Sequence, residues 1–104
     1  MNIQASYRPQ KYFVYTLLSL KTFDIYTGLT TDLKRRLEEH NRGMVSMTNI
    51  RIPFKLVHYE YFVNLEDAKS RELYLKSSAG RAQLKQSLKK TLASKVYIPY
   101  RLNR

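Results

Sequence analysis

The feature that most constrains the fold is a pair of short apolar runs close together near the start of the chain. Residues 12–18 and 23–27 are rich in aromatic and β-branched side chains, which favour strands. The segment between them is short enough to join the two runs as an antiparallel hairpin. The sequence therefore predicts a two-stranded hairpin as the first structural unit of the protein.

The hairpin brings two tyrosines together. If it is symmetric about Leu20 and Lys21, Tyr15 lies directly opposite Tyr26 on one side of the sheet. A slip of one residue would send one ring to the other side, so the pairing depends on register. Paired strand tyrosines can serve packing or chemistry, and the pair alone does not separate the two.

A helix is expected after the hairpin. Gly28 ends the second run, Thr30 or Thr31 can cap the helix, and Asp32 falls in its first turn, where the helix dipole favours an anion. Gly43 is a plausible stop. The buried stripe consists of leucines repeating every four positions: Leu29, Leu33 and Leu37.

The remaining chain completes an α+β domain. Residues 44–53 read as a loop, and 54–63 as a buried third strand. Asn64 caps a helix that runs to about Lys76 and stops near Gly80. A further helix carries Leu84, Leu88 and Leu92. The expected order is β-β-α-β-α-α, a small, mainly antiparallel three-stranded sheet flanked by helices. We expect one domain over 1–104, with its core over 11–93 and an extended tail over 94–104.

The charge of the chain points to a polyanionic partner. There are 19 Lys and Arg against 8 Asp and Glu, a formal net charge of +11. Repulsion among these positive charges opposes folding, so an anionic partner is expected. From Lys69 onward the sequence has ten basic residues and a single acid, Glu72. A merely solvated basic face is the simpler alternative. An anionic membrane surface is disfavoured because no amphipathic anchor is evident.

Other classes are excluded by composition. The chain has no cysteine, so disulfides and Cys-based zinc sites are impossible. No apolar run approaches the ~20 residues that span a bilayer, and the first residues lack the apolar stretch of a secretory signal. We expect a soluble, cytoplasmic protein, assumed monomeric.

Two further residues share a helical face. Arg36 and His40 are spaced i, i+4, and each lies three residues beyond a stripe leucine. Their face therefore borders the buried side of the helix. By themselves they can be surface residues, and Glu72 can be a solvated partner of Lys69 or Lys76.

Read in order, these positions resemble the GIY-YIG nuclease superfamily. Residues 12–15 (YFVY) and 25–28 (IYTG) are similar to its two tyrosine motifs, 31–41 (TDLKRRLEEHN) to its arginine helix, and 68–76 (AKSRELYLK) to its glutamate helix. The segment 78–81 (SAGR) resembles small stand-alone bacterial members. The chain departs from the pattern at Phe13, Val14 and Thr27. It also lacks the downstream asparagine of some members, since none follows Glu72 before Asn103.

The resemblance implies hydrolysis of a phosphodiester with one divalent metal, Mg²⁺ or Mn²⁺. A guanidinium can stabilise the charged transition state, which suits Arg36, and one carboxylate can hold such a metal, which suits Glu72. Tyr15 would be the base as phenolate, its pKa lowered by Arg36 and the metal. Tyr26 would orient phosphate or water. His40 is the rival base or a proton shuttle.

The resemblance also implies nucleic acid as partner, with DNA favoured over RNA and structured or branched forms included. The residues expected to contact phosphate are Lys34, Arg35, Arg36, Arg71, Lys76 and Arg81. The leading hypothesis is an endonuclease. The first alternative is a catalytically idle binding module of the same fold, acting as a repair or processing accessory. A basic structural or ribosome-associated protein is the second.

Overall fold

A computed structural model of the protein describes residues 10–94. Along the chain these form β1 (Tyr12–Ser19), β2 (Ile25–Thr30), α2 (Leu33–Asn41), the 3₁₀ turn η1 (Asn49–Arg51), β3 (Phe54–Phe62), α3 (Leu65–Lys76), α4 (Ser78–Ser87) and α5 (Lys89–Leu92). The α+β class and the predicted order of elements are confirmed, with the last expected helix divided in two. The tail expected over 94–104 lies, apart from Ser94, outside the described residues. No helix within 10–94 is long and apolar enough to cross a membrane.

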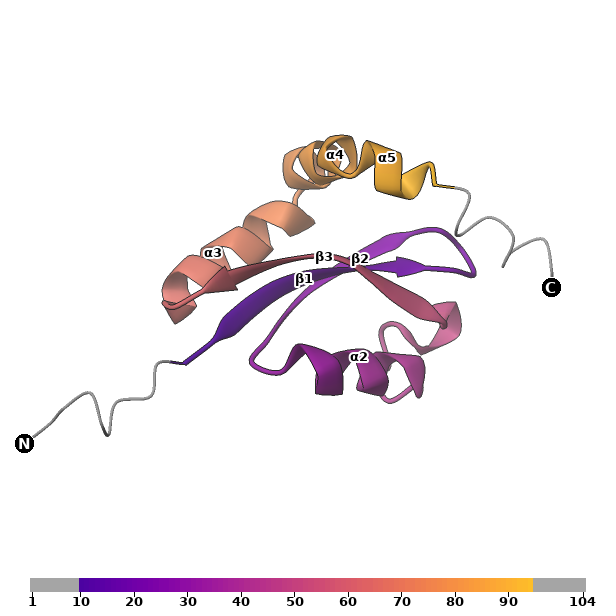
Figure 1. The fold of residues 1–104 in the computed structure, drawn as a ribbon, viewed down its shortest axis with the longest axis horizontal. Helices are drawn as coiled ribbons and strands as arrows, with labels where there is room; N and C mark the ends of the chain where they lie inside the picture. The colour runs from indigo at the N-terminus through magenta and orange to yellow at the C-terminus, as the bar shows by residue number, and fades with distance from the viewer. Residues whose placement is uncertain (1–9, 95–104) are drawn as a thin grey trace, which may run out of the picture.

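The sheet is antiparallel throughout, in the order β2-β1-β3. Figure 1 shows α2 on one face and α3, α4 and α5 on the other, so the molecule has three layers. Alternate residues of β1 point to the two faces, and each face has its own core. One core gathers around Val14, Leu18 and Leu75 under α3 and α4. The other gathers around Tyr15, Leu17 and Phe54 against α2.

The register of the hairpin differs from the symmetric prediction. Tyr15 pairs with Gly28, and Leu17 pairs with Tyr26. The turn is the cause, because Phe23 takes a left-handed conformation (φ 63°) and extends the loop, so that Ser19 pairs with Asp24 through a 2.9 Å hydrogen bond. The direct opposition of the two tyrosines was therefore wrong. A shift of two residues keeps side chains on their face, so the prediction that both rings share one face is confirmed.

The second strand begins and ends later than expected. It starts at Ile25 and continues through Gly28 to Thr30. The N-cap of α2 is Asp32, whose side chain accepts a hydrogen bond from the Arg35 amide at 3.1 Å, so the cap predicted at Thr30 or Thr31 is wrong. The Thr30 hydroxyl instead accepts from the Asp32 amide at 3.1 Å and turns the chain into the helix.

The break between α3 and α4 lies at Ser77 rather than at Gly80. The Ser77 hydroxyl donates to the Tyr74 carbonyl at 2.6 Å and accepts from the Gly80 amide at 3.1 Å, which ends one helix and caps the next. Gly80 has a different role. It lies so close to the Tyr74 carbonyl that a Cβ there would collide with it. Leu84 is buried, and Leu88 and Leu92 pack against the same core, as their spacing predicted.

Candidate active site

Three of the predicted site residues meet between the sheet and α2. Tyr15 comes from the middle of β1, Tyr26 from β2, and His40 from the last turn of α2. The ring centroids are 6.4 Å apart for the two tyrosines, 5.8 Å for Tyr15 and His40, and 5.2 Å for Tyr26 and His40. Two aromatic phenols and an imidazole therefore form one contact cluster.

Gly28 gives Tyr15 its place in this cluster. A Cβ at Gly28 would collide with the Tyr15 hydroxyl and lie 2.9 Å from its Cε1. The ring of Tyr15 therefore lies over the glycine, and a larger residue there would displace it. The glycine of the second motif is thus explained by the close approach of a tyrosine ring to the strand.

A buried hydrogen-bond chain continues from Tyr15. The Tyr15 hydroxyl lies 2.9 Å from His40 Nε2, and His40 Nδ1 lies 2.8 Å from the Thr48 hydroxyl. The Thr48 hydroxyl also donates to the Val45 carbonyl at 3.3 Å. Because its single proton goes to that carbonyl, Thr48 accepts from His40 Nδ1–H. Nε2 is then the bare nitrogen that accepts from Tyr15.

Burial sets the protonation of both partners. His40 and Thr48 are fully buried, and Tyr15 is 2% exposed. Loss of hydration lowers the pKa of His40 to about 4, and the positive charge of Arg36 lowers it further in the same direction. Burial raises the pKa of Tyr15 to about 12, although Arg36 opposes the rise. At neutral pH the site therefore holds a neutral imidazole and a protonated phenol.

Arg36 lies beside the Tyr15 hydroxyl at the edge of the cluster. Its guanidinium forms an ion pair with Glu39 at 2.9 Å, and about a third of the side chain is exposed. Hydrogen bonding to Tyr15 and to Glu39 raises the pKa of Arg36 above its ordinary value, so it stays charged. One positive group thus stands at the border between the buried rings and solvent.

Glu72 stands on α3, on the other side of the sheet from α2. Its side chain is about one fifth exposed, and its carboxylate forms an ion pair with Lys76 at 3.0 Å. Its negative charge is felt at Tyr15, whose pKa it raises slightly. Within residues 10–94 no three His, Cys, Asp or Glu side chains cluster as a metal cage. A lone carboxylate still fits an ion such as Mg²⁺, which keeps several waters and needs one or two carboxylates.

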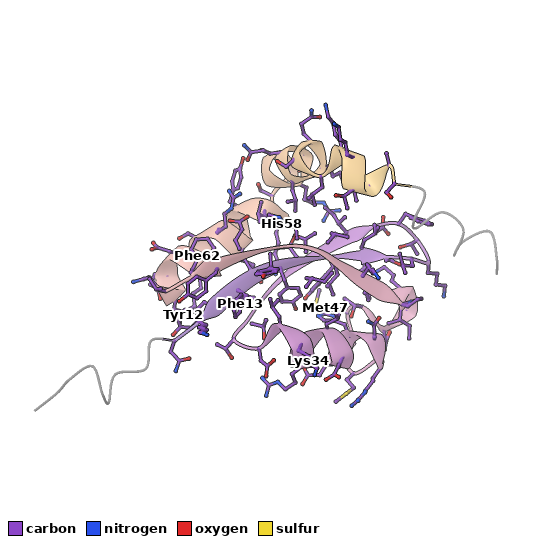
Figure 2. The ribbon with its side chains drawn as sticks, in the orientation of Figure 1. Tyr12, Phe13, Lys34, Met47, His58 and Phe62 are labelled. Atoms are coloured by element: carbon purple, nitrogen blue, oxygen red, sulfur yellow. The ribbon has the colours of Figure 1, made fainter. Side chains whose placement is uncertain are left out.

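The basic residues expected to contact phosphate lie on different parts of the molecule. Lys34 and Arg35 are exposed on α2, where Figure 2 labels Lys34. Arg81 on α4 reaches β2, where its Nη1 lies 3.4 Å from the Ile25 carbonyl. Arg71 is not brought to the cluster. Its Nε donates to Glu60 on β3 at 2.9 Å, at the opposite edge of the sheet from β2.

Sequence reasoning missed two residues that shape the site. Thr48 holds the far nitrogen of His40, and Glu39 holds Arg36. Glu39 could have been found, because its spacing of three from Arg36 puts both on one helical face. Thr48 could not, since it reaches His40 only through the folding of the 44–53 loop.

Comparison with known proteins shows the family of the chain. A family model described as the GIY-YIG catalytic domain matches residues 11–86. The chain is 36% identical over 86 residues to a UPF0213 protein of Clostridium perfringens, covering 82% of this chain and 91% of that one. It is 45% identical over 60 residues to a UPF0213 protein of Streptococcus pyogenes serotype M5, covering 57% and 65%.

A solved structure is similar as well. The solution NMR structure of a UPF0213 protein from Bacillus halodurans has 35% sequence identity and a TM-score of 0.49, over 82% of this chain and 95% of that one. The chain belongs to the GIY-YIG family, a nuclease superfamily. Within it, the similar proteins named above are UPF0213 proteins, a group of small stand-alone GIY-YIG domains.

Proposed function

We propose that the protein is a divalent-metal-dependent endonuclease that hydrolyses phosphodiester bonds of nucleic acid, with DNA favoured and branched forms included. The observation that carries the proposal is the buried chain from Tyr15 through His40 to Thr48, with a guanidinium beside the phenol. Membership of a nuclease superfamily supports the same reaction class. The net charge of +11 supports a polyanionic substrate.

The proton of the attacking water needs an acceptor, and His40 is the better candidate. A phenolate at Tyr15 is disfavoured because burial raises its pKa to about 12. His40 is neutral at physiological pH, and its bare Nε2 faces the Tyr15 hydroxyl. Tyr15 can take the proton of water while its own proton moves to His40. In this proposal Tyr15 relays the proton and His40 is the base.

The remaining site residues act on the phosphate. Arg36 is charged and about a third exposed, so it can donate paired hydrogen bonds to the non-bridging oxygens as negative charge builds up on them. Tyr26, in ring contact with both His40 and Tyr15, orients water or phosphate. Glu72, now paired with Lys76, would hold the metal. The ion, when bound, stabilises charge on the attacking or leaving oxygen.

A cleavage assay tests the proposal. Labelled DNA and RNA in single-stranded, blunt and branched forms are incubated with Mg²⁺ or Mn²⁺, or with a chelator. We expect cleavage of at least one form with metal, and none with the chelator. Tyr15→Phe should lower the rate by roughly 10²- to 10⁴-fold, because it removes the hydroxyl and little volume. An unchanged rate in this variant would contradict the proton relay. No cleavage of any form would favour the idle binding module.

A further inference from the structure

A hollow of about 460 Å³ opens at the free edge of β2. β2 is an edge strand, and segments from both sides of the sheet contribute walls to the hollow. Met47 and Arg51 come from the loop between α2 and β3, and Lys76 and Arg81 come from the α3–α4 side. Tyr26 lies in the hollow as well, which makes the hollow continuous with the proposed site.

The charge in the hollow is mostly positive. Three cationic side chains line it against one acid, Asp24. Lys76 is paired with Glu72. Among the described residues, neither Arg51 nor Arg81 has a carboxylate partner. Arg51 Nη2 donates to the Met47 carbonyl at 3.1 Å, and Arg81 Nη1 makes a long contact of 3.4 Å to the Ile25 carbonyl. Two guanidinium groups therefore face one recess with donors to spare, which suits a phosphate.

The wall from the loop adds an apolar group. Met47 is 73% exposed, and Figure 2 shows it between α2 and the sheet. An exposed, polarizable thioether is suited to contact a flat aromatic ring. A recess of this volume falls in the range that accepts a small molecule or a single nucleotide unit, and it is too small for a stretch of duplex.

We infer that the hollow binds one unpaired nucleotide next to the bond being cut, with its phosphate on Arg51 and Arg81 and its base against Met47. The inference rests on the proposed function, because Tyr26 belongs to both the hollow and the proposed site. It narrows the substrate class to nucleic acid with unpaired nucleotides, such as an overhang, flap or gap. A continuous duplex cannot place a base in the hollow without opening a pair.

Binding measured in chelator tests the phosphate contacts without cleavage. The probes are a labelled short duplex with blunt ends and the same duplex with an overhang, at the 3′ or the 5′ end. The parent should bind one overhang about tenfold more tightly than the blunt duplex. Arg51→Gln and Arg81→Gln should abolish that preference. Lys69→Gln removes the same charge from an exposed site outside the hollow, and should lower both affinities equally.

The base contact has its own pair of variants. Met47→Ala should weaken binding of the overhang about two- to tenfold, and should not affect an overhang of abasic sugar-phosphate. Met44→Ala removes a methionine of similar exposure outside the hollow, and should leave the affinities for both overhangs unchanged. Equal affinity of the parent for blunt and overhang duplexes would overturn the inference, as would equal effects of Arg51→Gln and Lys69→Gln. A protein that never cleaves would contradict the proposed function and leave this binding result intact.

Discussion

His40 combines features that a solvated histidine does not have. It is fully buried, bonded at both nitrogens, and flanked by the positive charge of Arg36. Burial and the charge of Arg36 both favour the neutral ring over the charged one. The same burial that keeps His40 neutral leaves Nε2 without a proton, so this nitrogen can accept the Tyr15 proton during reaction. Stability and chemistry are therefore linked at this one side chain.

The linkage predicts how stability depends on pH. The pKa of His40 is about 4 in the folded protein and about 6.5 when unfolded, so the unfolded chain binds the extra proton between these values. The free energy of unfolding should be flat above pH 7 and fall by up to about 3 kcal/mol as the pH drops from 6.5 to 4. Urea unfolding at several pH values measures it.

The window from pH 6.5 to 5 is the informative one, because carboxylates titrate mainly below it. His40→Gln should unfold with much less pH dependence there, whatever its absolute stability. A parent protein whose stability is constant across that window would show that His40 is not held neutral by the fold.

Thr48 should act as a positioning residue for His40. Thr48→Val keeps the shape but removes the oxygen that accepts Nδ1–H, so His40 can turn its proton toward Tyr15. We expect the cleavage rate constant to fall about tenfold, with binding in chelator unchanged. Thr48→Ser keeps the oxygen and should restore the rate. A serine variant as slow as the valine variant would mean that the methyl group, and not the hydroxyl, matters.

Strand and helix periods predicted that the two tyrosines share a face and that Arg36 and His40 share another. The choice of these residues and of Glu72 as a site came from the resemblance to the GIY-YIG superfamily. Their protonation states could not be predicted. The sequence suggested a phenolate at Tyr15, yet the pKa is raised, because the depth of burial comes from the packing of α2 on the sheet. The role of Thr48 was not predicted for a similar reason, because its contact with His40 depends on the path of a loop that has no periodic pattern.

At the scale of elements, β1 and β2 carry two buried hydroxyls that the fold does not satisfy. The hydroxyl oxygens of Thr16 and Thr27 have no hydrogen-bond partner among the described residues. They stand opposite each other in the hairpin, on the face covered by α3 and α4. A buried polar group without a partner costs stability.

Thr27→Val should therefore stabilise the protein. The substitution keeps the branched shape and removes the unpartnered hydroxyl, for a gain of about 1 kcal/mol. In a domain of this size the melting temperature should rise by about 4–8 °C. Differential scanning calorimetry of parent and variant measures the change. A lower melting temperature would mean that the hydroxyl forms a bond that the described contacts do not contain.

The sequence predicted the type of each strand and helix better than it predicted the register of the hairpin or the exact ends of the helices. Strand and helix identity followed from residue type and period, and the three leucines 84, 88 and 92 pack as predicted. The hairpin register did not follow, because Phe23 in a left-handed conformation lengthens a turn that carries no diagnostic pair. The position of the break between α3 and α4 was not predicted either, because the hydrogen bonds of the Ser77 hydroxyl set it and Gly80 does not.

At the scale of the whole molecule, the edge of β2 joins the two helical layers. α2 supplies Arg36 and His40 from one side, and α3 supplies Glu72 and Lys76 from the other (Figure 1). The net charge predicted a polyanionic partner, but not where the charges lie. Arg71 is an example, because its partner Glu60 lies on β3, at the opposite edge of the sheet from β2. The sequence does not give the order of the strands, so it could not show that Arg71 points away from the site.

The most direct test of the nuclease proposal separates cutting from binding at Glu72. Glu72→Gln keeps the size of the side chain and removes the charge that would hold the metal. Cleavage with Mg²⁺ or Mn²⁺ should vanish, while affinity in chelator stays equal or rises, because a negative charge beside phosphate is gone. Arg36→Ala, the comparison variant, should weaken both. A Glu72→Gln protein that cuts as fast as the parent would contradict the proposal.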